Sequence, residues 1–328
     1  MDLDSTSPSS SVAKQKGAHV YNVMDSLDFE FLHEHHIEWV TLITWGGQEA
    51  IDSPEMRHHN KDSTYIQEVN SRMYKRIMEA REAGFKVFVK PHLWIRVAEG
   101  GGWRSDVFPQ NDSNWLRWQE SYRDYIFRFA QIAEAAKAEQ FCIGAELTRL
   151  TTEKPEFWIQ LIQDVREMYS GKLTYAANWY HEYENIMFWD QLDFIGVQAY
   201  FPLSNKDQPS VEQLSAGWQK HLETLEGIHK QFQRPILFTE MGYKSTPNGA
   251  ERPWEWAEHL PEGEKKYTPE VQTNAYQAFF KSVWPQDWFA GVQLWVLFAD
   301  YPEERKDLTI GFSPQGKPAM EVLRIAFE

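Results

Sequence analysis

The sequence contains one cysteine among its 328 residues, Cys142. A single thiol cannot form an internal disulfide, so cysteine usage leaves the redox compartment of the protein open. The neighbouring residues Phe141 and Ile143 predict a buried strand position, where a thiol is unreactive.

Long apolar runs are also missing. The longest uncharged apolar stretch, 288–299, is bracketed by Asp287 and Asp300 and falls short of the roughly 20 residues that span a bilayer. We therefore expect no integral membrane segment. Residues 1–16 (MDLDSTSPSSSVAKQK) are polar, lack the apolar core of a signal peptide and are predicted to form a disordered tether. A trimmed export signal or an expression remnant would leave such a stretch, and we expect an exported protein (periplasmic, cell-surface or secreted) rather than a cytoplasmic one.

Positive charge is in deficit. The chain has 33 Lys and Arg residues against 48 Asp and Glu residues, a formal net charge of −15. The electric field of a negatively charged protein repels phosphate backbones and anionic lipids, which argues against nucleic acid and membrane surfaces as partners. A glycine-rich phosphate loop after the first predicted strand is absent too, which disfavours a doubly wound nucleotide-binding sheet.

Histidines are present but lack metal-site spacing. His33, His35 and His36 lie on the first predicted helix without the His-Glu-x-x-His pattern, and His58 and His59 are similar. We interpret them as solvated surface and expect neither a metal nor an organic cofactor. The acidic run 262–264 is interpreted as a solvated loop.

Eight short apolar runs alternate with longer helical periods. They are 18–22, 39–45, 85–95, 141–147, 173–179, 193–201, 235–243 and 291–299. Most lack polar alternation, as is typical of parallel strands covered on both faces. The pattern predicts an α/β chain with a single (β/α)8 TIM barrel over residues 17–328. A doubly wound open sheet is the alternative.

Helix and loop signals support the barrel. Ser210 heads a capping box with Gln213 and precedes apolar residues at steps of three and four. Connections after the strands are long (46–63, 97–111 and 244–267), whereas returns from helix to strand are tight. Because a barrel enzyme builds its site on the strand-to-helix side, the asymmetry places the site at the carboxyl ends of the strands.

Two predicted strands end in a glutamate. The segment FCIGAEL places Glu146 at the end of the fourth strand, and PILFTEMGY places Glu240 at the end of the seventh. Asp193, in contrast, lies at the start of the sixth strand, at the barrel floor, where carboxylates usually contribute to stability. Burying a carboxylate that has no partner costs several kcal/mol, so a pair of carboxylates at facing strand ends indicates a functional site. Cleavage of a glycosidic bond needs such a pair, one acid for the leaving oxygen and one carboxylate to attack or to activate water.

The chain resembles glycoside hydrolase family 113, β-mannanases of the large retaining clan, from about Lys16 to Phe327. The segments that carry the resemblance are VKPHLWI (89–95), WR (103–104), FCIGAEL (141–147), LTYAANW (173–179), WDQLDFIGVQAYFPLS (189–204), PILFTEMGYKS (235–245) and WFAGVQLW (288–295). The ensemble is specific, whereas no single segment would suffice.

The resemblance implies that Glu146 is the acid/base and Glu240 the nucleophile. It also implies a sugar pocket built by residues at or near other strand ends: His92, Trp103, Arg104, Asn178, Trp179, Gln198, Tyr200 and Trp295. Tyr200 would hydrogen-bond the nucleophile, and Trp295 would form the floor beneath the reacting ring. The structural alternative is that Trp179 and Trp295 only cap the barrel core.

Two positions depart from the pattern of the resembled clan. Ala145 stands where a residue such as Asn binds the sugar 2-hydroxyl, and Val296 follows the strand-eight Trp295 where a Lys is common. The resemblance implies a retaining endo-acting hydrolase of β-1,4-mannosidic bonds, which works by double displacement on a β-linked polysaccharide or oligosaccharide. We expect a monomer. The alternatives are the same mechanism on another β-linked glycan and a carbohydrate-binding protein on a degenerate hydrolase barrel.

Overall fold

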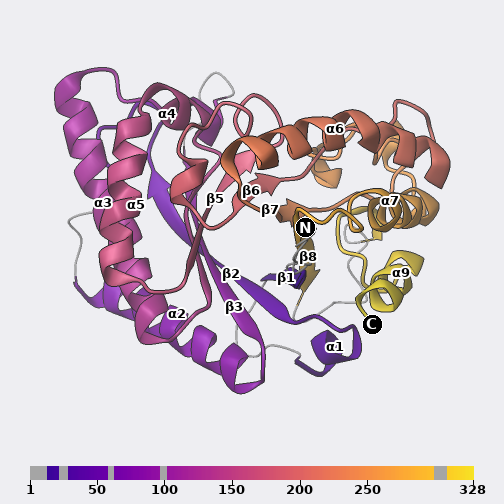
Figure 1. The fold of residues 1–328 in the computed structure, drawn as a ribbon, viewed down its shortest axis with the longest axis horizontal. Coiled ribbons are helices and arrows are strands. Elements are labelled where there is room, and N and C mark those ends of the chain that lie inside the picture. The colour runs from indigo at the N-terminus through magenta and orange to yellow at the C-terminus, as the bar shows by residue number, and fades with distance from the viewer. Residues whose placement is uncertain (1–12, 22–28, 58–62, 97–101, 299–308) are drawn as a thin grey trace, which may run out of the picture.

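The computed structural model describes residues 13–21, 29–57, 63–96, 102–298 and 309–328. Eight parallel strands form a closed barrel in chain order, with β1 pairing with both β2 and β8 (Figure 1). They are β1 Gln15–Tyr21, β2 Trp39–Gln48, β3 Lys86–Ile95, β4 Gln140–Ala145, β5 Lys172–Asn178, β6 Ile195–Gln198, β7 Ile236–Met241 and β8 Phe289–Phe298. The predicted (β/α)8 barrel is confirmed.

Helices surround the barrel. In Figure 1, α2, α3 and α5 cover one side, and α6, α7 and α9 cover the other. Their bounds are α1 Phe29–Glu34, α2 Ser63–Glu82, α3 Asp112–Ala135, α4 Thr148–Glu153, α5 Pro155–Met168, α6 Val211–Phe232, α7 Pro269–Ser282 and α9 Pro318–Phe327, with short 3-10 turns at 104–106, 189–191, 257–259 and 262–264. The predicted capping box at Ser210 and Gln213 starts α6. Among the described helices, none is long and apolar enough to cross a membrane.

The amino-terminal boundary differs slightly from expectation. The predicted tether covered residues 1–16, but Gln15 and Lys16 belong to β1, and Gln15 is buried. Residues 1–12, and the histidines His58 and His59, lie outside the described residues. The barrel therefore starts two residues earlier than position 17.

The barrel interior is layered from bottom to mouth, the mouth being the end where the carboxyl ends of the strands lie. At the bottom, Gln15 donates to Gln140 and accepts from Gln293, with 2.8 Å for each hydrogen bond. A small apolar cluster follows, which includes Phe88 and Cys142. Burial raises the pKa of the Cys142 thiol to about 11, which confirms the expected buried, unreactive thiol. Charged and polar side chains occupy the layer above, where the site lies.

Candidate active site

Glu240 lies near the end of β7 and is buried. Its Oε1 accepts a hydrogen bond from the Lys90 ammonium at 2.6 Å, and its Oε2 accepts one from the Tyr200 hydroxyl at 2.8 Å. Burial raises the pKa of Glu240, the Lys90 charge opposes that rise, and the negative charge of Glu146 adds to it. Each carboxylate oxygen thus has a donor, which fixes the rotamer of Glu240.

Lys90 on β3 is the counter-ion of Glu240, and sequence reasoning missed it. Its side chain is fully buried, and its ammonium also donates to Gln198 Oε1 and, at 3.2 Å, to the Thr239 carbonyl. A signal was available, because a lysine inside the apolar run VKPHLWI must find a buried partner. Gln198, which was predicted to contact sugar, accepts a hydrogen bond from Lys90.

His92 and His19 complete the surroundings of Glu240. Arg104 Nη1 lies 3.1 Å from His92 Nδ1, and because arginine only donates, Nδ1 is the acceptor and Nε2 carries the proton. That Nε2 lies 3.6 Å from Glu240 Oε1. Burial, followed by the Lys90 and Arg104 charges, lowers the pKa of His92 well below its usual range. Burial and Lys90 do the same to the pKa of His19, whose Nδ1 donates to the Leu294 carbonyl at 3.2 Å. Both rings are therefore neutral.

Glu146 directly follows β4 and has a left-handed backbone, with φ of 56°. Its Oε2 is 3.1 Å from Arg104 Nε and accepts a hydrogen bond from Trp103 Nε1 at 3.1 Å. The Arg104 guanidinium also lies over the Trp103 ring, 4.4 Å from its centroid. The third strand-to-helix loop, whose Trp-Arg pair was predicted to line the sugar pocket, therefore holds this carboxylate in the mouth.

One chain of contacts joins the two glutamates. Glu240 faces His92, His92 contacts Arg104, and Arg104 contacts Glu146. The carboxylates therefore lie in the same mouth, each beside its own cation. Such a pair can supply one protonated acid and one ionised base or nucleophile.

The comparisons with known proteins agree with this geometry. The model of Glycoside Hydrolase Family 113 matches residues 13–317. The chain belongs to glycoside hydrolase family 113. It is a glycoside hydrolase, and the expected family membership is confirmed.

Solved structures of this family are similar over nearly the whole chain. A GH113 β-1,4-mannanase is 25% identical with a TM-score of 0.79, over 96% of this chain and 99% of its own. The GH113 β-mannanase AaManA from Alicyclobacillus acidocaldarius is 24% identical with a TM-score of 0.78, over 96% and 97%. The Ruminococcus gnavus β-glucuronidase is 14% identical with a TM-score of 0.62, over 97% of this chain and 50% of its own, and shows the fold alone. No curated protein has a matching sequence.

The remaining predicted residues of this GH113 chain also lie at the mouth. Trp295 on β8 is buried with its ring edge-on to His19, the centroids being 5.0 Å apart. Trp179 follows β5 and stacks on Trp254 at 5.1 Å. Asn178 ends β5, and its Nδ2 donates to Thr148 Oγ1 at 3.0 Å. Trp179 and Trp295 both pack on core residues as well.

Sequence reasoning missed two further features of the mouth. Trp45 and Trp94 are exposed on β2 and β3, and Trp45 lies edge-on to His92 at 5.0 Å. Glu182, in the turn after β5, is a fully buried carboxylate. Nothing in the apolar runs of β2 and β3 distinguishes these tryptophans from core residues, and nothing in the polar stretch HEYE separates buried Glu182 from exposed Glu184.

Metal ligands do not gather in the described part of the chain, where no cluster of three or more His, Cys, Asp or Glu residues could hold an ion. His33 Nε2 lies 3.0 Å from the Ala83 carbonyl, and His35 Nδ1 lies 2.8 Å from the Phe31 carbonyl. Both rings thus contact backbone oxygens at the surface.

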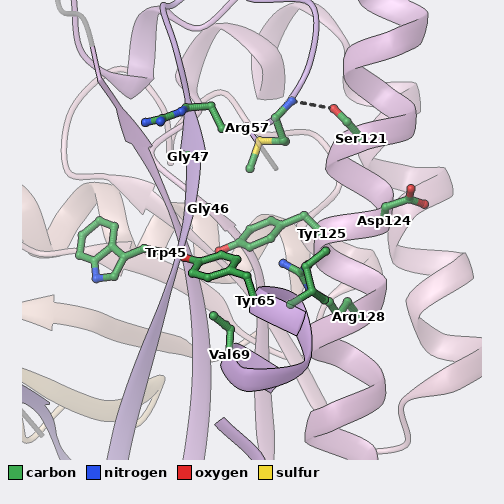
Figure 2. Close-up of a pocket in the computed structure, with 12 residues that line it drawn as sticks. Trp45, Gly46, Gly47, Arg57, Tyr65, Val69, Ser121, Asp124, Tyr125 and Arg128 are labelled. Carbon is green, nitrogen blue, oxygen red and sulfur yellow. Dashed lines mark hydrogen bonds between the residues drawn. The ribbon is translucent and has the colours of Figure 1, made fainter. Parts of the chain in front are cut away.

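A small cavity of about 70 Å³ lies away from the glutamates, between β2 and helices α2 and α3. Figure 2 shows Tyr65, Tyr125 and Arg128 around it, with Trp45 on the other side of the strand. Its volume suits a few water molecules rather than a sugar ring. We therefore place the active site at the barrel mouth and not in this cavity.

Proposed function

We propose that this chain is a retaining endo-acting hydrolase of β-1,4-mannosidic bonds, with Glu240 as nucleophile and Glu146 as acid/base. The observation that carries the proposal is the different environment of the two carboxylates. Glu240 is held by the ammonium of Lys90 and the hydroxyl of Tyr200, whereas Glu146 lies at the mouth beside Trp103 and Arg104. Two of the similar solved structures are GH113 β-1,4-mannanases, which supports the substrate class.

In the first half-reaction, Glu240 attacks the anomeric carbon while Glu146 gives its proton to the departing glycosidic oxygen. The products are a glycosyl ester on Glu240, an ionised Glu146 and a released chain end. In the second half-reaction, Glu146 takes a proton from water, the water oxygen attacks the anomeric carbon, and Glu240 leaves as carboxylate. Atoms and charge balance over the two steps.

Tyr200 and His92 restrict where charge can develop. Burial and the negative charge of Glu240 raise the pKa of Tyr200 well above its usual range, so its hydroxyl stays protonated and keeps donating to Glu240. His92 stays neutral and presents an N–H toward the same carboxylate. Glu240 therefore keeps its orientation without gaining a second cation that would weaken its nucleophilicity.

Exposed tryptophans support action within a polymer. Trp45 and Trp94 lie on β2 and β3, and Trp254 stacks on Trp179 beyond β5. Aromatic faces pack against the C–H faces of sugar rings, so rings on both sides of the glutamates could be bound. An endo-acting enzyme needs such contacts on both sides of the scissile bond.

The test is release of reducing ends from a panel of β-1,4-mannan, glucomannan, β-1,4-glucan and β-1,4-xylan, with Glu240→Ala as the inactive control. Endo-action predicts mixed oligosaccharides and an early fall in mannan viscosity. The alternative substrate, suggested by Ala145, predicts faster release from another glycan. Binding without any release would overturn the enzyme assignment in favour of a carbohydrate-binding protein.

A further inference from the structure

Glu182 is a buried carboxylate that the proposed chemistry does not use. It lies in the turn after β5, is fully buried and thus does not contact a substrate. Its Oε1 accepts hydrogen bonds from the Tyr175 hydroxyl at 2.7 Å and from Thr151 Oγ1 at 3.0 Å. Its Oε2 accepts one from the backbone N–H of Asn178 at 2.7 Å. One side chain therefore connects β5 and α4.

The same network reaches the backbone of Glu146. The Tyr175 oxygen accepts a hydrogen bond from the N–H of Leu147 at 2.6 Å, and Leu147 directly follows Glu146. On the other side, the N–H of Glu146 donates to the Ala176 carbonyl at 3.0 Å. A left-handed backbone is unfavourable for a residue other than glycine, so the peptide at Glu146 needs support from its surroundings.

Glu182 accepts three hydrogen bonds as a carboxylate. The N–H of Asn178 can only donate, and the Tyr175 oxygen already accepts from Leu147. A proton on Oε2 would face the Asn178 N–H, and a proton on Oε1 would require the Thr151 hydroxyl to turn its single hydrogen to the Thr148 carbonyl, 3.0 Å away. Burial raises the pKa of Glu182 to about 7, although the three hydrogen bonds lower it, and the charge of Glu146 raises it further.

We propose that Glu182 is a positioning residue that orients the acid/base Glu146 through Tyr175 and the peptide of Leu147. The inference rests on the proposed function, because it assumes that Glu146 protonates the leaving oxygen. Glu182 also fixes the backbone of Asn178, whose side chain contacts Thr148 at the start of α4. Loss of Glu182 should thus impair acid catalysis without removing the nucleophile.

The experiment compares aryl β-mannosides or β-mannobiosides that differ in the pKa of the phenol released. With a well-placed acid, kcat/KM depends only weakly on the pKa of the released phenol. Without the acid, kcat/KM falls steeply as that pKa rises. Glu182→Ala should lower kcat/KM about 10- to 100-fold for the poorest leaving group and little for a dinitrophenol, so its slope approaches that of Glu146→Ala. Glu182→Gln, which keeps the shape and loses the charge, should give an intermediate slope.

Asp193→Asn is the matched control. Asp193 accepts the N–H of Leu173 at 2.8 Å, so it holds the same strand at the opposite end of the barrel. We expect the wild-type slope for this variant. Thermal unfolding of each variant checks the fold, and Glu182→Gln carries the test if Glu182→Ala does not fold.

The two proposals fail in different ways. The slopes are those of log kcat/KM plotted against the pKa of the phenol. A steep slope for Glu146→Ala, together with the same slope for wild type and both Glu182 variants, would overturn the positioning role and leave the acid/base assignment intact. An unchanged slope for Glu146→Ala would overturn the acid/base assignment and the positioning role together.

Discussion

At the scale of residues, the two glutamates differ in what holds them. Lys90 and Tyr200 fix Glu240 deep in the barrel, and Arg104 and Trp103 hold Glu146 at its rim. The neutral ring of His92 separates the two cations. The proposed nucleophile and the proposed acid/base thus occupy one mouth with separate counter-ions.

Removal of each glutamate should give a different kinetic result. Glu240→Ala should abolish turnover of every substrate because no glycosyl ester can form. Glu146→Ala should lose about 10²- to 10⁴-fold on mannan yet retain the glycosylation step with activated aryl glycosides, which need little protonation. Pre-steady-state release of the phenol measures that step. Equal losses on both substrates in two folded variants would refute this division of roles.

Lys90 should set the acidic limb of the pH profile. The Lys90 charge lowers the pKa of Glu240 against the effect of burial, so Lys90→Met should raise that pKa further. Because the nucleophile must be ionised, the acidic limb of kcat/KM should move to higher pH. Lys90→Arg keeps the charge and should move it less. A limb that stays in place in Lys90→Met would show that another group sets it.

At the scale of elements, the strands were predictable and their ends were not. The run 141–147 predicted a strand through Leu147, but β4 ends at Ala145 because Glu146 turns into a left-handed conformation. The run 193–201 contains only the short β6, Ile195–Gln198, because Asp193 lies before the strand at the barrel floor and the chain turns after Gln198, whose carbonyl accepts the N–H of Tyr200 at 2.9 Å. Apolar runs show which segments are buried, whereas backbone turns at their ends depend on tertiary contacts.

The site was predictable to the same degree. Glu146 and Glu240 follow from apolar runs that end in a carboxylate. The partners Lys90 and Glu182 depend on which side chains meet inside the barrel, and a single sequence does not contain that register. Trp45 and Trp94 were missed for the same reason, because only the strand register places them at the mouth.

The cap of α6 offers a test of stability at this scale. Ser210 Oγ accepts a long hydrogen bond from the Gln213 N–H at 3.4 Å, and Gln213 Oε1 accepts one from the Ser210 N–H at 3.0 Å. Ser210→Ala should lower the free energy of unfolding by about 0.5–1 kcal/mol, the low end for such caps. Urea denaturation measures it, with Gln219→Ala on the exposed side of α6 as control. An unchanged midpoint for Ser210→Ala would show that the long bond contributes nothing.

At the scale of the whole molecule, the closed barrel fixes the distance between β4 and β7 and with it the stereochemistry. We expect the two carboxyl groups to be about 5–5.5 Å apart, the separation of a retaining mechanism. The first product should then keep the β-configuration. Proton NMR during the first minutes of hydrolysis, before mutarotation, reports the anomer. An α-anomer as first product would refute Glu240 as nucleophile.

Because each glutamate is paired with its own buried cation, we expect kcat to be insensitive to salt concentration. In the proposed cycle, the negative charge lies on Glu240 beside Lys90 before attack. Once the ester forms, it lies on Glu146 beside Arg104, and the second half-reaction returns it. The total charge of the pocket therefore stays constant through the cycle, and dissolved ions have no net change to screen. On a neutral oligosaccharide, kcat should be the same in dilute buffer and in about 1 M salt. A strong salt dependence of kcat would mean that charge enters or leaves the pocket during catalysis.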